Sequence, residues 1–513
     1  MQPSNELHQL IHSLTKSEKR FFKLHSSLQE GEKNYLKIFD AIDAQDFYDE
    51  SALKEEFSNE TFIRHLPSEK NHLYKQILKA LRSYHAENSI SAILTQELKN
   101  IEILYNKGLF KECNKFILRA KKIALTNEKF SHLFELISWE KILLEKAFED
   151  GEFTKDLHTL IEEEQEVQKK IRNLAAYHGL YSKVNYVFSS GGFARDDESR
   201  ALINEIAQHP LIVGKNTALS NRAASICYYT QGYCALAHGD FTTALLRFRR
   251  VKDILDAHPN LREDLATRYI KTLANIISCT IDNGNYNAAL EDIAALLKMR
   301  DESGFENTDM ALTIFKTCSI AELRIFQRQG LFKEALPLVE RILEGMERFE
   351  RRFAKEQEIS FYFHIAYTYF GMGNYSKALA WINKVLNDNE DTLRQDVYSY
   401  ARIFNLFIHF ELGNGDLLEY TTKSTQRYLS RRQRDFQMEL LIIDYLRRLI
   451  RSPRSGNNKK LFGEFKQKLS EVAVLPEDQI ILRYFDVGSW IDSKMRGTSF
   501  SDAVRERAAQ ETF

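Results

Sequence analysis

The stretch Gly371–Leu386, GMGNYSKALAWINKVL, contains a short pattern that returns several times along the 513-residue chain. Its second glycine, Gly373, is followed two residues later by an aromatic residue, Tyr375, and five residues later by a small residue, Ala378. Apolar residues follow at offsets of nine and twelve. Because offsets of five, nine and twelve lie on one face of an α-helix, the stretch predicts a turn at the glycine and then an amphipathic helix.

The same pattern occurs at four other glycines. Each glycine is followed by an aromatic residue at offset two, a small residue at offset five, and apolar or small residues at offsets nine and twelve. We expect each glycine to end the preceding helix in a left-handed conformation, and each small residue to let two helices approach closely. The five copies are Gly108/Phe110/Cys113/Ile117/Ala120, Gly239/Phe241/Ala244/Phe248/Val251, Gly284/Tyr286/Ala289/Ile293/Leu296, Gly330/Phe332/Ala335/Val339/Ile342 and Gly373/Tyr375/Ala378/Ile382/Val385.

The spacing of the copies indicates a repeat array. The last four glycines are 45, 46 and 43 residues apart, and the 131 residues from Gly108 to Gly239 leave room for further units. We place weaker copies at Gly151 and Gly191, and a last one after Gly413 or Gly415. Each unit is a helical hairpin whose apolar face its neighbours must cover. The sequence therefore predicts an all-α, right-handed superhelical solenoid of about eight helical pairs.

The pattern resembles the tetratricopeptide repeat over roughly residues 90–425. Its period of about 44 residues is longer than the usual length of about 34 in that family, and this longer type resembles bacterial signalling and regulatory solenoids. The first residues of the chain resemble the start of uncharacterised helical-repeat proteins of Bacteroidota. The residues before Gly373 follow the family's order of large, aliphatic, small and aromatic: Tyr362, Ile365, Ala366 and Tyr369.

The repeat divides the chain into three predicted regions. Residues 1–90 lack the pattern and form a helical N-terminal domain, whose helix at LTKSEKRFF begins with a capping box of Thr15 and Glu18. Residues 91–425 form the solenoid, and residues 426–513 form a helical cap that shields the last apolar face from water.

The resemblance also implies where a partner binds. In tetratricopeptide arrays the first helix of each pair faces the concave groove, so its non-packing positions are candidate contacts. Aromatic residues beside Arg, Lys and Asn suit an extended peptide or an acidic helix. Alternatively, some of these side chains lie against a neighbouring superhelical turn. The candidates are Tyr229, Tyr233, Lys271, Arg324, Arg328, Phe363, Tyr367, Phe370, Arg402, Asn405 and His409.

Two basic clusters suggest a different function, a nucleic-acid- or ribosome-associated regulator. Although the whole chain carries a net charge of -1, residues 421–470 hold 13 Lys or Arg against 4 Asp or Glu. Such clusters contact phosphates, or simply form a solvated face. An acidic stretch at residues 145–166 adds self-association through opposite charges as a further alternative. The clusters are Lys16, Lys19, Arg20 and Lys23 on one helical face, and Arg431, Arg432, Arg434, Arg447, Arg448 and Arg451.

The sequence lacks the motifs of the common enzyme classes. It has no Walker-type loop, no GxSxG elbow and no HExxH helix, and its five cysteines have no zinc-ligand spacing. His8 and His12 share a helical face, but no third ligand stands near them in the sequence. We therefore predict a non-enzymatic protein without a cofactor or metal. A third hypothesis is a peptide-sensing regulator whose solenoid tightens on binding.

The remaining composition points to the cytoplasm. The cysteines are dispersed, as expected of buried free thiols in a reducing compartment. The first residues lack the charged and apolar regions of a leader peptide, and no segment approaches the roughly 20 apolar residues of a membrane span. The overall prediction is a cytoplasmic scaffold that binds a peptide or helix of another protein.

Overall fold

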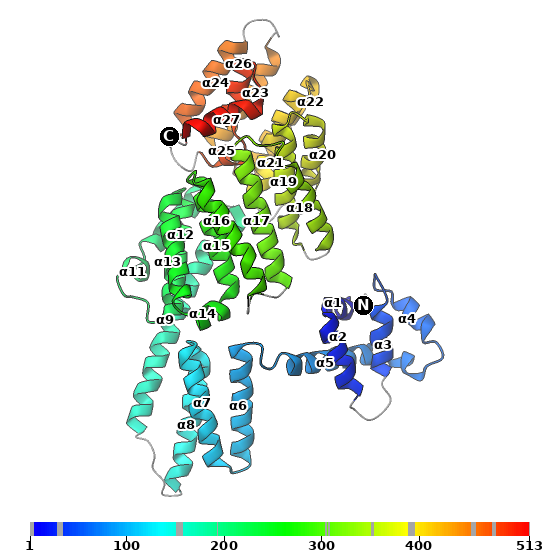
Figure 1. Ribbon diagram of the computed structural model, residues 1–513, viewed down its shortest axis with the longest axis vertical. Helices are drawn as coiled ribbons and strands as arrows, with labels where there is room; N and C mark the ends of the chain where they lie inside the picture. The colour runs from blue at the N-terminus through cyan, green and yellow to red at the C-terminus, as the bar shows by residue number, and fades with distance from the viewer. Residues whose placement is uncertain are drawn as a thin grey trace. The chain divides into compact units, whose positions relative to one another are not determined.

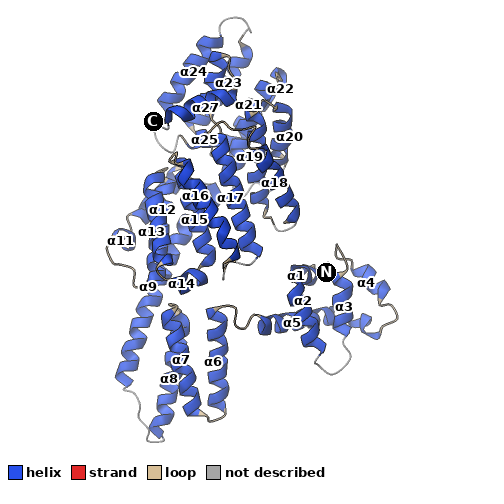
Figure 2. Ribbon diagram, viewed as in Figure 1, coloured by secondary structure: helices blue, strands red, loops and turns tan. Residues whose placement is uncertain are grey.

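The computed structural model describes residues 5–27, 34–149, 157–191, 193–302, 305, 308–349, 353–387, 395–452, 458–474 and 479–511. Within these residues the secondary structure is helical and contains no strand (Figure 2). The predicted all-α class is therefore confirmed. The chain divides into two compact units, Met1–Gln168 and Lys169–Phe513, which are described separately. The predicted cap lies in the same unit as the last four glycine repeats.

The first helices of unit 1 share one apolar core, in which Phe22, Phe39 and Ile77 are fully buried. The capping box is confirmed, because the backbone N–H of Thr15 donates to Glu18 Oε2 at 2.7 Å and the backbone N–H of Glu18 donates to Thr15 Oγ1 at 3.2 Å. These elements are α1 (Glu6–Ser13), α2 (Lys16–Ser27), α3 (Asn34–Asp43), α4 (Glu50–Glu56), the 3-10 helix η1 (Thr61–His65) and α5 (Leu66–Tyr84).

The rest of unit 1 consists of α6 (Ile90–Asn106), α7 (Phe110–Thr126), α8 (Phe130–Glu149) and the start of α9 (Leu157–Gly191). Helix α7 packs against both α6 and α8. The weaker copy expected at Gly151 lies outside the described residues. The following helix, α9, is continuous over 35 residues, so no repeat turn divides the chain between residues 157 and 191.

Unit 2 holds the remaining helices, and Figure 1 shows them following one another from green to red. They are α10 (Asp197–Ala207), α11 (Pro210–Val213), α12 (Asn221–Ala237), α13 (Phe241–Asp256), α14 (Pro259–Asp264), α15 (Ala266–Asp282), α16 (Tyr286–Lys298), η2 (Met299–Asp301), α17 (Thr308–Arg328), α18 (Leu336–Arg348), α19 (Lys355–Gly371), α20 (Tyr375–Leu386), α21 (Gln395–Glu411), α22 (Gly415–Arg431), α23 (Gln437–Arg451), α24 (Asn458–Val472), α25 (Ile480–Tyr484), α26 (Val487–Arg496) and α27 (Phe500–Glu511).

The helices of unit 2 pack in a regular order. Helix α15 contacts α13, α16 and α17, α17 contacts α16 and α19, α19 contacts α20 and α21, and α21 contacts α22 and α23. From α15 onward, the first helix of each pair thus touches both its own partner and the first helix of the next pair. Helices α15, α17, α19 and α21 form a continuous series, and α13, the second helix of the preceding pair, packs at its start.

The predicted glycine turns are confirmed. Gly108, Gly239, Gly284, Gly330 and Gly373 have φ between 69° and 77°, and so does Gly413. At Gly239, the glycine N–H donates to the carbonyl of Leu236 at 2.9 Å, and the next N–H donates to the carbonyl of Ala235 at 3.0 Å. These are the two bonds of a Schellman motif, and all six glycines make the equivalent pair.

The residue after the glycine often starts the second helix. Asp240, Asn285 and Asn374 each accept a hydrogen bond from the backbone N–H three positions ahead, at 2.9 to 3.2 Å. The glycine therefore satisfies carbonyl groups of the first helix while its neighbour satisfies an N–H of the second. The small residues Cys113, Ala244, Ala289, Ala335 and Ala378 are all 0% exposed, as predicted for close helix packing.

The last helices turn back against earlier ones within unit 2. Helix α26 packs on α24 and α27, and α27 contacts α17. Gly330, at the end of α17, receives hydrogen bonds on its carbonyl oxygen from Ser501 Oγ at 2.8 Å and Arg505 Nε at 3.2 Å. We call residues 479–511 the C-terminal segment. It joins the end of the chain to the middle of the helical series.

We predict that Gly373→Ala lowers the free energy of unfolding by about 1 kcal/mol, because a residue with a Cβ is strained at φ 77°. The midpoint of urea unfolding should fall accordingly. Nothing lies within 4 Å of the position that a Cβ would occupy, so the cost isolates the backbone effect. The matched control is Gly463→Ala inside α24, where the site is equally open and alanine favours the helix. Equal midpoints for the two variants would contradict the turn mechanism.

Candidate functional site

Much of the predicted groove is covered by the C-terminal segment. Phe485 lies 5.6 Å from Tyr367, 5.2 Å from Phe370 and 4.5 Å from Phe407 between ring centroids. Phe500 lies 5.5 Å from Phe370. These side chains are buried and form part of one apolar core.

The prediction that these aromatic residues contact a ligand therefore needs correction. Phe363, Tyr367 and Phe370 stand at positions that the repeat pattern does not use for packing within a hairpin. The structure packs them against residues more than a hundred positions away in the chain, with exposed fractions of 2%, 7% and 0%. Tyr367 also accepts the backbone N–H of Asp486 at 3.3 Å through its hydroxyl. An outside peptide cannot reach these side chains while the C-terminal segment is in place.

The two predicted arginines of α17 serve the same contact. Asp282, at the end of α15, is 5% exposed and lies 2.8 Å from Arg324 Nη2, 3.8 Å from Arg328 Nη2 and 3.1 Å from Arg483 Nη1. Arg324 Nη1 also donates to Ser278 Oγ at 2.8 Å. Burial raises the pKa of Asp282, but the three guanidinium groups outweigh it and hold that pKa below its ordinary value.

A second buried ion pair ties the start of unit 2 to α23. Arg195, in the segment before α10, pairs with Glu439, and the side chains are 3% and 1% exposed. Its Nη1 donates to the hydroxyl of Tyr400 at 3.2 Å, and its guanidinium stacks on Phe436 at 3.9 Å. Burial disfavours the charge, but Tyr400 and Glu439 outweigh that effect and raise the pKa of Arg195.

The candidates on α21 are also engaged within the protein. Arg402 stacks on Tyr428 at 4.0 Å. Asn405 and His409 are each 6% exposed, and His409 Nδ1 lies 3.2 Å from Asn414 Nδ2. Burial lowers the pKa of His409. Asn405 and His409 are therefore not presented to an open surface as the groove prediction required, and Arg402 is half-buried.

The candidates on α12 and α15 lie elsewhere. Tyr229 is 2% exposed and packs with Tyr181 and Tyr233 at centroid distances of 5.5 and 5.1 Å. Tyr233 is half-buried, and Lys271 is exposed. Tyr229 and Lys271 line a cavity of about 330 Å³. This is the part of the predicted set that borders open space.

The N-terminal basic stripe partly pairs with the neighbouring helix. Lys19 forms an ion pair with Asp43, and Lys23 lies 2.6 Å from Asp40, both on α3. Lys16 and Arg20 are exposed. Two of the four predicted phosphate contacts are therefore occupied by carboxylates of the same domain.

The C-terminal basic cluster is also largely engaged. Arg448 and Arg451 pair with Glu464 at 3.0 Å and Glu419 at 2.7 Å. Arg432 stacks on Tyr428 at 4.6 Å, while Arg434 and Arg447 are half-buried. Arg431 is exposed. The surplus of positive charge counted along the sequence is thus smaller on the surface, because acidic residues from neighbouring helices approach it.

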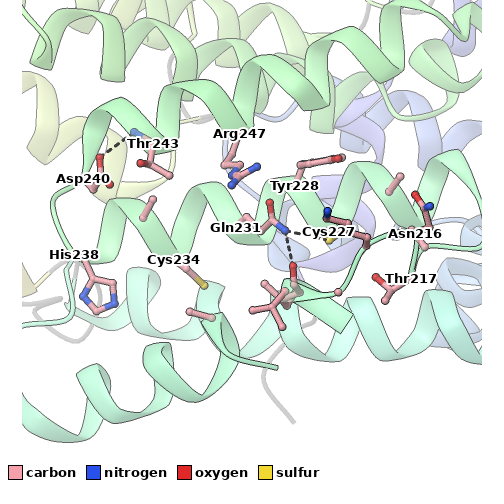
Figure 3. Close-up of a pocket in the computed structure, with 18 residues that line it drawn as sticks. Asn216, Thr217, Cys227, Tyr228, Gln231, Cys234, His238, Asp240, Thr243 and Arg247 are labelled. Carbon is pink, nitrogen blue, oxygen red and sulfur yellow. Dashed lines mark hydrogen bonds between the residues drawn. The ribbon is translucent and has the colours of Figure 1, made fainter. Parts of the chain in front are cut away.

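A cavity of about 860 Å³ lies between α12, α13 and the segment that joins α10 to α12 (Figure 3). We call it the α12–α13 cavity. Its wall combines apolar residues such as Ile212 and Val213 with polar ones. In Figure 3, Arg247 comes from α13 and points toward α12, where Tyr228 and Gln231 lie.

The polar groups of the α12–α13 cavity are only partly satisfied. Gln231 donates from Nε2 to the carbonyl of Ile212 at 2.6 Å, while its Oε1 atom is buried without a hydrogen-bond partner. Arg247 is exposed, and Val213 is 63% exposed. Open polar groups beside apolar surface are typical of binding cavities. Sequence reasoning did not predict Tyr228, Gln231 and Arg247 as site residues, because Tyr228 stands at a packing position of the repeat and the other two lie outside the repeated pattern.

The histidines and cysteines have structural surroundings. His8 Nε2 lies 2.9 Å from the carbonyl oxygen of Gln45, and His12 Nε2 lies 3.3 Å from that of Ile42, so both contact the end of α3. All five cysteines are free and buried, as predicted. Within the described residues, no group of three His, Cys, Asp or Glu side chains has the arrangement of a metal site.

Comparisons with protein-family models and with curated proteins were made. No protein-family model matches the chain, and no curated protein is significantly similar to it. Among the helices of the described residues, none combines the length and the apolar character that crossing a membrane would take.

We predict that Asp282→Asn destabilises the protein by about 3 kcal/mol at neutral pH, since it leaves buried guanidinium groups without their counter-charge. Because the pKa of Asp282 is lowered in the folded state, its contribution is present above its ordinary value of about 4 and is lost as the pH falls through the folded-state value. Urea unfolding across this pH range should show the difference from wild type shrinking in acid. A pH-independent difference would contradict the assignment.

We also predict that Phe485→Ala destabilises the protein by about 3 to 5 kcal/mol, because it empties the centre of the aromatic cluster. Tyr420→Ala is the matched control in the same unit, since Tyr420 is 72% exposed and its loss should change stability by less than about 0.5 kcal/mol. Thermal unfolding followed by circular dichroism compares the two. A small effect at Phe485 would mean that the C-terminal segment is only loosely attached.

Proposed function

We propose that this protein is a non-enzymatic, cytoplasmic scaffold of the tetratricopeptide-like, long-period type, which binds a peptide or helix of a partner protein in the α12–α13 cavity. The observation that carries the proposal is this cavity of about 860 Å³, which is built by two helices of the repeat and remains open. The covered groove is excluded from the proposed binding surface because the chain's own C-terminal segment fills it.

The solenoid architecture has support from three features. The six glycine turns share one geometry, the small residues that follow five of them are fully buried, and from α15 onward the first helices of successive pairs contact each other. An array built in this way presents a preformed surface, so a partner binds with little reorganisation of the scaffold. We propose the right-handed superhelix on this basis.

A protein partner suits the α12–α13 cavity because its wall exposes apolar surface. Val213 lines the cavity at 63% exposure. An exposed apolar side chain in a partly polar wall favours a partner segment that buries it. Arg247 supplies a charge for an acidic residue of that segment.

The proposal is tested by site-specific crosslinking in the source cells. We expect p-benzoylphenylalanine introduced at Tyr228 to attach one protein partner covalently, and mass spectrometry of the product to identify one short segment of it. The matched control places the same group at Tyr420, which is 72% exposed on α22. The Arg247→Glu variant should reduce the yield at Tyr228 about tenfold, because it reverses the charge at the rim.

Two results would replace the proposal. If nuclease removes the crosslinked material, the nucleic-acid alternative and its basic clusters become the binding site to study. If the same proteins crosslink at Tyr228 and Tyr420 and Arg247→Glu changes nothing, the α12–α13 cavity does not recognise a partner.

A further inference from the structure

A smaller cavity on another side of α12 has a distinct chemical character. Its volume is about 330 Å³, and it is lined by Tyr181 of α9, Tyr229 of α12, Arg268 and Lys271 of α15, and Met310 of α17. It shares no lining residue with the α12–α13 cavity. We call it the Arg268 cavity. An inference about it is therefore independent of the proposed partner.

Arg268 has no counter-ion among the residues that the structure describes. Its guanidinium forms no ion pair there, and its Nη1 atom is buried without a hydrogen-bond partner. Burial lowers the pKa of Arg268, and the nearby charge of Arg222 acts in the same direction. This differs from Arg195 and Arg324, whose buried guanidinium groups each meet a carboxylate of the chain.

The carboxylates around the cavity do not cancel its positive charge. Asp264 lies 2.5 Å from Arg222 Nη2 and so already neutralises a different arginine. Glu263 is exposed at the edge of the cavity. Lys271 stands three residues after Arg268 and therefore on the same face of α15, where it adds a second cation. The lining thus holds two cations, Arg268 and Lys271, and two carboxylates, Glu263 and Asp264, of which Asp264 is already paired with Arg222.

The other walls restrict the size and type of ligand. The rings of Tyr181 and Tyr229 and the side chain of Met310 supply apolar surface. The hydroxyl of Tyr229 lies 3.5 Å from Asn275 Nδ2. A cavity of this size accepts a small molecule or a single side chain.

We propose that the Arg268 cavity binds a small organic oxyanion, whose carboxylate or phosphate faces Arg268 and Lys271 and whose apolar body packs on Tyr181, Tyr229 and Met310. Guanidinium and ammonium groups both bind such oxygens, and the arginine fork favours two of them at once. The ligand would supply the counter-charge that Arg268 lacks.

Three probes distinguish the sources of the anion: phenyl phosphate, benzoate and inorganic phosphate. We expect phenyl phosphate or benzoate at millimolar concentration to raise the thermal midpoint of the full-length protein, and inorganic phosphate to raise it less. A larger shift with phenyl phosphate assigns a phosphate ligand, and a larger shift with benzoate assigns a carboxylate. If no probe shifts the wild-type midpoint, the proposal is overturned.

Substitutions test whether the probes bind in the Arg268 cavity. Calorimetric titration should show about tenfold weaker binding for Arg268→Gln and weaker binding for Lys271→Gln, whose exposed side chain puts the fold at no risk. Arg431→Gln, at an exposed position on α22, should bind as wild type does. Without ligand, Arg268→Gln should be at least as stable as wild type, since it removes a buried charge that has no partner. Equal binding by both arginine variants, or a lowered midpoint of ligand-free Arg268→Gln, would overturn the proposal.

Discussion

The left-handed glycine at the end of each first helix is the constraint on which the repeated part of this protein depends. A helix leaves its last carbonyl groups without partners, and the Schellman bonds at Gly239 and its equivalents satisfy two of them within two residues. An Asp or Asn directly after the glycine then caps the second helix at three of these turns. The turn therefore fixes where the next helix begins, and the small residue five positions later lies fully buried in the helical packing.

The inner series of helices creates a second requirement, because its apolar and charged residues must be covered. The C-terminal segment covers the rings of three residues of α19: Tyr484 packs on Phe363, and Phe485 and Phe500 pack on both Tyr367 and Phe370. Burying Asp282 is costly unless cations surround it, and Arg483 of the same segment supplies one of the three. Aromatic burial and charge compensation thus act together, so the end of the chain stabilises the middle of the series.

The sequence was sufficient for the local elements and insufficient for the long-range contacts. The turns at Gly108 to Gly373, the capping box of Thr15 and Glu18, and the buried small residues follow from short-range geometry, which recurs at fixed offsets. The continuous helix α9 was not foreseen, because the repeat spacing predicts two helices between turns at Gly151 and Gly191. The covering of Phe370 by Phe485 depends on residues more than a hundred positions apart, for which a single sequence carries no periodic signal.

The same distinction explains which candidate residues lost their predicted role. Position within a hairpin does not indicate whether water or another helix lies beside a side chain. Tyr367 contacts the C-terminal segment and Arg324 contacts Asp282 of α15, whereas Lys271 remains exposed beside a cavity. The arginines at such positions differ further in whether a carboxylate of the chain lies beside them. The charges of Arg324 and Arg195 are balanced within the fold, because they pair with Asp282 and Glu439. In the described part of the chain, the guanidinium of Arg268 has no such carboxylate, so the fold alone does not balance its charge.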